Sequence, residues 1–267
     1  MKLNEHIAIS TPTLLLVPYE AHHVPTYHQW MQDPEIQLAT ASEPLSLEEE
    51  YSNQLSWRTS TDKLTFIICS PLAPSLSPPN TVPNDADTPP KMLGDVNLFL
   101  YPSEEEYTSS PAPAIPKEVV GEVDIMIADA KNRGKGLGER VVRAFVGWVW
   151  EHRGEVMREY VGDKVEEGQE GVEVPRLGML MVKIGEGNES SIKLFRDKLG
   201  WVQEGARNYF GEEGGGRGGL RGVVRERVRG LGRKFMLAAD FVYTFWQLAF
   251  FFLAILKHGV FPAFDSL

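Results

Sequence analysis

The sequence offers little sulfur chemistry, because its 267 residues include a single cysteine, Cys69. One cysteine excludes an internal disulfide framework, and its position in the apolar stretch LTFIICS predicts a reduced thiol in the core. The first ten residues, MKLNEHIAIS, contain no long apolar run, so no secretory signal is predicted. Both absences fit a cytosolic compartment. Hydrophobic residues make up 42% of the chain, which is enough for a substantial core.

Positive charge is scarce in the body of the chain. The formal net charge is −10, yet residues 208–234 carry seven Arg or Lys against three Glu. An acidic body argues against a nucleic-acid-binding surface and is compatible with a cationic substrate. Metal-binding patterns are lacking as well: His22, His23 and His28 have no cysteine or acidic residue at metal-ligand spacing, so no metal site is predicted.

Three closely spaced glycines, Gly134, Gly136 and Gly138, match neither familiar nucleotide-binding spacing. The dinucleotide motif needs G-x-G-x-x-G, and the Walker loop needs Lys and then Ser or Thr, whereas glutamate follows Gly138. A glycine turn that opens a helix still presents free backbone N–H groups and the positive end of the helix dipole to an anion. An ordinary glycine-rich loop without a ligand is the alternative.

Hydrophobic periodicity predicts a mixed α/β sheet with insertions at its hairpins. Strands are predicted at 13–19, 64–70, 94–101, 119–128, 176–184 and from 201 onward. Helices are predicted at 23–32, 46–57, 138–152 and 188–200. The helix at 46–57 begins with a capping box of Ser46 and Glu49. Insertions are predicted at the proline-rich 71–90, at 102–116 and at the acidic, glycine-rich 154–174.

The C-terminal part differs in composition from the rest of the chain. Residues 208–234 are predicted to be a Gly/Arg-rich linker that could contain a final strand at 221–228. The apolar stretch 235–256 would span about 33 Å as a helix at roughly 1.5 Å per residue, long enough for a bilayer core. Its one acid, Asp240, lies near the amino end, where the cost of membrane burial is smaller.

This pattern predicts a transmembrane helix at 235–256, followed by a short tail at 257–267. The basic flank on the amino side predicts a tail-anchored arrangement with a cytoplasmic catalytic domain. A peripheral amphipathic helix and translated non-coding sequence in a gene model are the alternatives.

Several segments resemble the GCN5-related N-acetyltransferases. The pattern Arg133-x-x-Gly136-x-Gly138 after a strand is similar to their R/Q-x-x-G-x-G/A pyrophosphate loop, and GNESSIKLFRDKLGW at 187–201 is similar to their N-x-x-S/A-x-x-L-Y/F-x-x-x-G-F segment. The stretches TLLLVPY, TASEPLSLEEEY, GDVNLFL and EVDIMIA resemble the N-acetyltransferase 9 subfamily. The resemblance covers residues 1–207 and implies an N-acetyltransferase domain there, with a mixed central sheet and flanking helices.

The resemblance also implies the activity and the cofactor contacts. The expected enzyme transfers the acetyl group of acetyl-CoA to an amine of a protein or peptide. Backbone N–H groups of one loop would hold the CoA diphosphate: Arg133, Gly134, Lys135, Gly136, Leu137 and Gly138. Met126, Ile127 and Ala128 would pair with the pantetheine arm like a neighbouring strand. Asn188 and Ser191 would face that arm, although an N-cap role for Asn188 is the alternative.

Two carboxylates are candidates for the general base. Alternation along the strand places Glu122 and Asp124 on one face, where either could remove a proton from the acceptor amine. Solvated carboxylates at the edge of a cleft are the alternative reading. Glu43, in the loop before the helix at 46–57, could attract a cationic substrate or simply be exposed.

Two positions depart from the family pattern. The usual acid tyrosine falls at Phe195, which cannot donate a proton, and a strand position that carries a base in some relatives falls at Met181. Chemistry would then rely on substrate positioning and on Glu122 or Asp124. A non-catalytic CoA-binding or protein-interaction module and a small-amine acetyltransferase are the competing functions.

Overall fold

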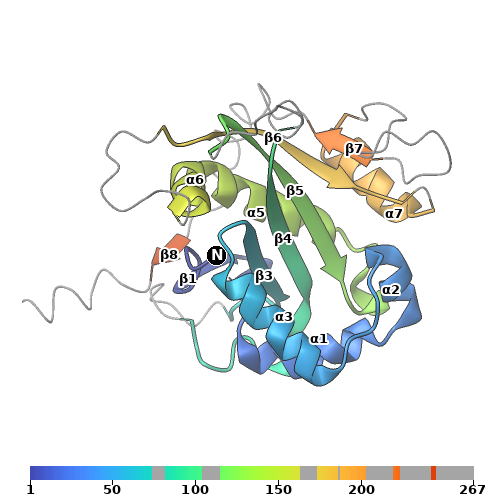
Figure 1. Ribbon diagram of the computed structural model, residues 1–267. Coiled ribbons are helices and arrows are strands. Elements are labelled where there is room, and N and C mark those ends of the chain that lie inside the picture. Colours follow the sequence, from blue (N-terminus) through green and yellow to red (C-terminus); the bar gives the residue numbers. More distant parts are fainter. Residues whose placement is uncertain are drawn as a thin grey trace, which may run out of the picture.

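The computed structural model describes residues 1–73, 82–103, 115–162, 173–185 and 187–202, together with the backbone of 219–222 and 242–244. A mixed sheet with the strand order β7-β6-β5-β4-β3-β2-β1-β8 runs through the molecule (Figure 1). Neighbouring strands are antiparallel except for β5 and β6, which are parallel. The strands are β1 (Ile7–Thr11), β2 (Leu14–Pro18), β3 (Lys63–Cys69), β4 (Met92–Pro102), β5 (Glu118–Ile127), β6 (Arg176–Lys183), β7 (Gly219–Gly222) and β8 (Val242–Thr244).

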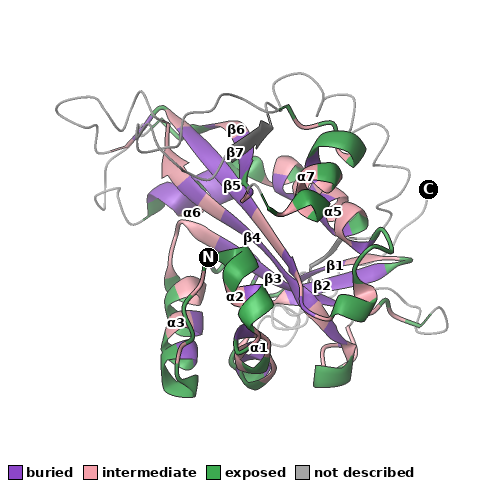
Figure 2. Ribbon diagram, turned by 90° about the vertical axis from the view of Figure 1, so that its right-hand side faces the viewer, coloured by how far each residue is buried: buried purple, intermediate pink, exposed green. Residues whose placement is uncertain are grey.

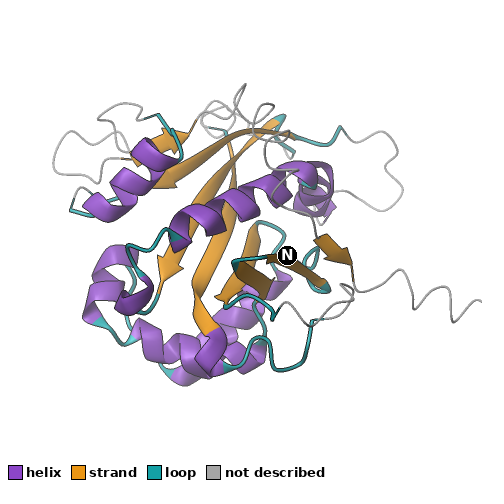
Figure 3. Ribbon diagram, turned by 180° about the vertical axis from the view of Figure 1, so that it is seen from behind, coloured by secondary structure: helices purple, strands orange, loops and turns teal. Residues whose placement is uncertain are grey.

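Helices cover both faces of this sheet. The helices α1, α2 and α3 lie on one face and α5 and α6 on the other, where α5 crosses the strands (Figure 3). The helices are α1 (Val24–Met31), α2 (Pro34–Thr40), α3 (Leu47–Thr59), α5 (Leu137–Glu151), α6 (Arg153–Gly162) and α7 (Glu189–Ile192), the last continued by a π-helical turn at Lys193–Lys198. The fold therefore has two helical layers with the sheet between them.

Alternating side chains of the strands pack into hydrophobic clusters on both faces of the sheet, and the central strands are largely buried (Figure 2). On the α5 side, Phe66 from β3 meets Phe145 and Trp148 edge-to-face, with ring centroids 6.0 and 5.6 Å apart. On the α1 side, Ile67 from β3 and Met126 from β5 pack with apolar residues of the first helices. The period of two along β3 and β5 thus separates an apolar face from a face that also carries polar groups.

The predicted helices and strands through 202 largely form as expected. The helix α3 begins with the predicted capping box, in which the Ser46 hydroxyl accepts from the Glu49 backbone N–H at 3.3 Å and the Glu49 carboxylate accepts from the Ser46 N–H at 2.8 Å. The apolar face predicted for α5 is buried as a whole: Val141, Val142, Phe145, Trp148 and Val149. Burial raises the pKa of the Cys69 thiol to about 12, as expected for a core cysteine.

Four local predictions were wrong or incomplete. The short strand β1 was missed, as was the helix α2, which Pro34 opens after the N-cap Asp33. Residues 154–162, the start of the insertion predicted at 154–174, lie in the helix α6, which buries Val156, Met157, Tyr160 and Val161. Residues 201 and 202 are not in a strand, and the remainder of that prediction lies outside the described residues.

The C-terminal predictions fall mostly outside the described residues. The sheet takes in β7 beside β6 at 219–222, which overlaps the first two residues of the strand predicted at 221–228; the rest of that prediction lies outside the described residues. Within 235–256 only Val242–Thr244 are described, and they form β8, which pairs antiparallel with β1. A strand at these residues does not support the predicted transmembrane helix. Across the described ranges, every helix is too short or too polar to cross a bilayer.

Candidate active site

The two parallel strands β5 and β6 pair over only part of their length. Their ladder runs from Glu118–Arg176 to Glu122–Met181, while β5 continues for five more residues to Ile127. Beyond the last pair the strands diverge, β5 toward α2 and β6 toward α7 (Figure 1). The end of β5 is paired with β4 as far as Gly94–Ile127. Its other edge is therefore where an extended ligand could add as a strand.

Polar side chains gather on the α1 face of the strands where this divergence begins. Direct cross-strand partners share a face, so the pairs Asn97–Asp124 and Phe99–Glu122 place both predicted carboxylates on the same face as the polar residues of β4. Next to Asn97, β3 contributes the buried Thr65. The expectation that Glu122 and Asp124 share a face is thus confirmed.

The two carboxylates have different surroundings. Glu122 is buried and accepts a hydrogen bond from the Lys183 ammonium at 2.7 Å. Asp124 is half-buried, and desolvation raises its pKa from the usual 3.8 to about 7, with the charges of Glu122 and Asp95 adding to the rise and Lys183 opposing it. Asp124 can therefore exchange a proton near neutral pH.

A second polar group on β4 was missed by the sequence analysis. Asp95 is buried, and its Oδ2 accepts hydrogen bonds from Asn97 Nδ2 at 2.8 Å and from the Tyr27 hydroxyl at 3.4 Å. Burial raises the pKa of Asp95 to about 6, against the opposing effect of these hydrogen bonds. The signal was present in the segment GDVNLFL, where Asp95 and Asn97 alternate with apolar residues in a strand with the same period as Glu122 and Asp124.

The glycine loop connects the end of β5 to the first turn of α5, and its glycines have separate structural reasons. Gly134 and Gly136 have φ values of +71° and +75°, in the left-handed region that favours glycine. Gly136 is the N-cap of α5 and provides no side-chain cap. Gly138 is closely packed, because a Cβ there would lie 3.1 Å from Leu194 Cδ2 and the leucine side chain would have to shift. The first turn of α5 thus presents N–H groups without a capping side chain, which suits a phosphate.

Arg133 does more than precede the glycines. Its guanidinium donates to the Ile127 and Ala128 carbonyl oxygens at 2.9 and 3.0 Å and lies 3.9 Å from a carboxylate oxygen of Glu35 in α2. Arg133 therefore fixes the end of β5. The carbonyl oxygens of two of the three residues predicted to pair with pantetheine already accept hydrogen bonds from this side chain, whereas no such bond involves Met126.

The remaining residues considered in the sequence analysis lie in β6 and in the helical segment that follows it. Asn188 is the N-cap of α7, and its Oδ1 accepts from the Ser191 backbone N–H at 3.1 Å, so the alternative reading of Asn188 is realised. Phe195 is buried and packs edge-to-face on Trp201, with ring centroids 5.0 Å apart. Met181, on β6, is buried and pairs with Glu122 of β5. Phe195 thus serves the core at the position of the family tyrosine.

Glu43 lies exposed in the loop between α2 and α3. The structure does not bring it into the hydrogen-bonded carboxylate group of β4, β5 and β6.

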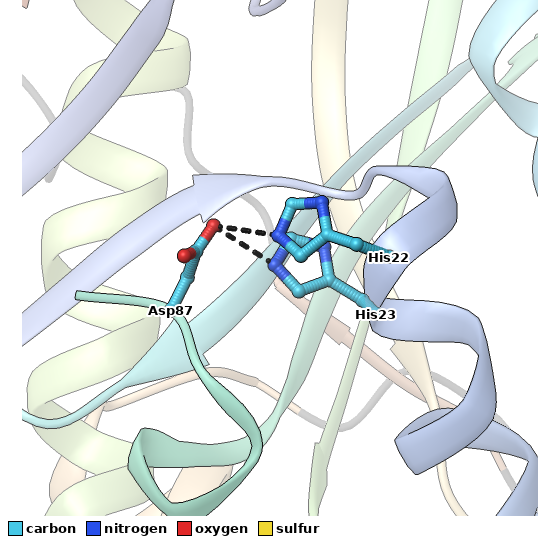
Figure 4. Close-up of side chains that lie close together, drawn as sticks. All are labelled: His22, His23 and Asp87. Carbon is cyan, nitrogen blue, oxygen red and sulfur yellow. Dashed lines mark hydrogen bonds and ion pairs between the residues drawn. The ribbon is translucent and has the colours of Figure 1, made fainter. Parts of the chain in front are cut away.

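The histidines before α1 meet an acid from a distant segment, contrary to the expectation that they lack one. His22 Nε2 and His23 Nε2 lie 2.9 and 3.1 Å from Asp87 Oδ2 (Figure 4). The buried His23 accepts the Glu20 backbone N–H on Nδ1 at 3.0 Å. A neutral ring with Nδ1 as acceptor carries its proton on Nε2, which then donates to Asp87. A metal ion at Nε2 would have to displace that proton. The contacts of His22 and His23 with Asp87 therefore fit a structural role, in which they hold the 82–91 segment against the start of α1, better than a metal site.

Comparison with known proteins identifies the family. The family model described as "Acetyltransferase (GNAT) domain" matches residues 13–201. The chain belongs to the GNAT family of acetyltransferases, which take the acetyl group from acetyl-CoA, and it is an N-acetyltransferase.

Its relatives carry N-acetyltransferase 9 names. The N-acetyltransferase 9-like protein of Caenorhabditis elegans is 38% identical over 212 residues, which are 79% of this chain and 86% of that protein. The alpha/beta-tubulin-N-acetyltransferase 9 of Homo sapiens is 35% identical over 213 residues, which are 79% of this chain and 83% of that protein. Both relatives agree with the resemblance seen in the sequence.

The fold agrees with a solved acetyltransferase. The structure of aminoglycoside acetyltransferase AAC(6')-Ib in complex with coenzyme A matches with a TM-score of 0.51 at 15% sequence identity, covering 81% of this chain and 99% of that one. At this identity the match speaks for the fold alone.

Proposed function

We propose that this N-acetyltransferase acetylates an amine of a protein, with Asp124 as the general base. The observation that carries the proposal is the position of Asp124: it lies in the part of β5 that β6 no longer pairs, one loop away from the uncapped first turn of α5. A proton acceptor and an anion-binding helix start are thus joined by a single short stretch of chain.

The loop and the first turn of α5 fit the diphosphate of the cofactor. A side chain at Gly136 would be strained at φ +75°, and a Cβ at Gly134 would meet no atom within 4 Å, so this backbone is open to a close ligand. The N–H groups of Gly134 to Gly138 would hold the diphosphate, and the end of β5 from Met126 to Ala128, beyond its pairing with β6, would contact the pantetheine arm. When bound, acetyl-CoA supplies the thioester that the amine attacks.

Asp124 suits the role of base better than Glu122. A base works best when its pKa lies near the working pH, and burial brings the pKa of Asp124 to about 7. Glu122 accepts a hydrogen bond from the Lys183 ammonium at 2.7 Å, which occupies one of its oxygens. In this scheme Glu122 and Lys183 set the electrostatic environment, and Asp124 removes the proton from the attacking nitrogen.

A protein amine is the proposed acceptor. Three relatives carry the name alpha/beta-tubulin-N-acetyltransferase 9, and the human one is 35% identical over most of both chains. The net charge of −10 and the exposed Glu43 beside the first helices favour a positively charged chain segment near the acceptor. Asn188 and Ser191, at the start of α7, are retained as candidate contacts of the pantetheine arm.

Release of CoA thiol in the presence of different acceptors tests this assignment. The acceptors are amino-terminal peptides of α- and β-tubulin, the same peptides with a blocked amino terminus, and spermidine. We expect turnover with a free peptide amine, little with the blocked peptides and little with spermidine. Turnover with spermidine alone would move the function to a small-amine acetyltransferase. Acetyl-CoA binding without turnover on any acceptor would favour a non-catalytic module.

A further inference from the structure

Two buried oxygen atoms beside Asp124 lack a hydrogen-bond partner among the described residues. They are Asp95 Oδ1 and Asn97 Oδ1, in side chains that are only 2% and 5% exposed. Buried acceptors are rarely left unpaired in folded proteins, because the lost hydrogen bond to water is not replaced. Each of these two oxygens can therefore accept a further hydrogen bond.

The orientation of Asn97 is fixed by its neighbour. Its Nδ2 donates to Asp95 Oδ2 at 2.8 Å, and a flipped amide would place two acceptor oxygens against each other. The Tyr27 hydroxyl donates to the same Asp95 oxygen at 3.4 Å. Since the amide nitrogen is held by Asp95, the amide oxygen is the end of Asn97 that stays available.

Asn97 lies directly opposite Asp124 in the β4–β5 ladder. Directly opposed side chains have Cβ atoms about 4.5–5.5 Å apart, within reach of a side-chain hydrogen bond. An ionised Asp124 has only acceptor oxygens and cannot bond to Asn97 Oδ1. A protonated Asp124 has one O–H donor and can. The unpaired oxygen of Asn97 thus matches one protonation state of the base.

We propose that Asn97, oriented by Asp95 and Tyr27, accepts the hydrogen bond of the Asp124 carboxyl once Asp124 has taken the proton of the acceptor amine. This inference rests on the proposed function, in which Asp124 is the base. The amine nitrogen forms the C–N bond, its proton passes to Asp124, and the C–S bond breaks with its electron pair on sulfur. The proton later returns to solvent, and the thiolate takes one up from solvent. Asn97 is a positioning residue in this scheme.

Other charged and titratable groups also act on Asp124. Asp95 on β4 and Glu122 on β5 favour its protonated form, and Lys183 on β6 favours the ionised form. From the helices, Tyr27 of α1 contacts Asp95, and Glu50 of α3 lies buried near Tyr27. A substitution at position 97 leaves these groups in place but also removes the hydrogen bond from Asn97 to Asp95, so the control variant has to keep a donor for Asp95.

The matched variants Asn97→Val and Asn97→Thr test the proposal. Both side chains have the same shape and suit a strand, but only threonine offers an oxygen, whose hydrogen can be donated to Asp95. We measure kcat/KM for peptide acetylation against pH. Loss of the acceptor destabilises protonated Asp124, so the acid limb should lie about one pH unit lower in Asn97→Val than in Asn97→Thr, which should stay near the wild type.

Equal acid limbs in the wild type, Asn97→Val and Asn97→Thr would overturn the proposal. Thermal unfolding and acetyl-CoA affinity of each variant confirm that the fold and the cofactor loop are intact. If Asn97→Val does not fold, Asn97→Ala removes the same oxygen without a branched side chain, and the same comparison with Asn97→Thr applies. An acid limb that survives in Asp124→Asn would instead refute the base assignment, so the two failures are distinguishable.

Discussion

Replacing Asp124 by asparagine keeps the shape of the side chain and removes the titrating group. A general base contributes roughly 100- to 10,000-fold to rate, so kcat/KM should fall by that factor at pH 7.5. In the wild type, an acid limb should appear near pH 7, because burial raises the pKa of Asp124 to about 7. In Asp124→Asn this limb should disappear, and the small remaining rate should not follow that titration.

Asp124→Asn should lower the activity but raise the stability of the folded protein near neutral pH. A carboxyl group whose pKa rises from 3.8 to about 7 binds more protons in the folded than in the unfolded protein between these pH values. The free energy of unfolding of the wild type therefore falls as pH rises through this window, with an upper bound of about 4 kcal/mol for the whole span. Asp124→Asn lacks this term, so its stability relative to the wild type should increase from pH 4 to pH 7.5.

Two assays on the same preparations decide the matter: CoA thiol release and urea unfolding, each across this pH range. We expect an inactive variant that is at least as stable as the wild type at pH 7.5. An active Asp124→Asn with an unchanged acid limb would refute the role as base. A loss of activity together with a loss of stability at pH 7.5 would refute the account of a costly buried carboxylate.

The remaining predictions concern the neighbouring carboxylate, the loop and the core. Glu122→Gln should reduce the rate less than loss of the base and move the acid limb to lower pH, because one negative charge beside the base is removed; an acid limb at unchanged pH would contradict this. Gly136→Val should abolish measurable acetyl-CoA binding in calorimetry, because a β-branched residue is strained at φ +75°, whereas Gly147→Ala, with open space at its Cβ, should bind normally. Phe145→Ala should lower the free energy of unfolding by about 3–5 kcal/mol, since Phe145 is fully buried; thermal melting measures it, and a loss below about 1 kcal/mol would contradict it.

Strong local signals made most of the fold predictable. The capping box at Ser46 and the apolar face of α5 specify their helices within a few residues, and alternation places Glu122 and Asp124 on one face. By contrast, β1 has only five residues, and it is buried because it pairs with β2 and β8. One partner, β2, follows β1 directly in the chain, but the other, β8, is distant in the sequence, so a local pattern does not specify both of its pairings.

Other features arise from contacts that no local pattern contains. Asp87 reaches His22 and His23 across more than sixty residues of sequence. Lys183 reaches Glu122 in the same way, from the neighbouring parallel strand. Asp95 and Asn97 were visible as alternating polar residues in a strand, but their importance depends on lying opposite Asp124, which requires the register of β4 and β5. The sequence alone therefore does not predict which residues surround a candidate catalytic side chain in space.

Transfer of an isotope-labelled acetyl group tests the central claim most directly. The full chain is mixed with acetyl-CoA labelled in the acetyl group and with αβ-tubulin, and the tubulin chains are digested and sequenced by mass spectrometry. Asp124→Asn, shown to bind acetyl-CoA, serves as the control. The account predicts labelled acetyl on a protein amine with the wild type and a large reduction with the variant. Equal labelling by both proteins, or no labelled amine with a folded wild type that binds acetyl-CoA, would contradict it.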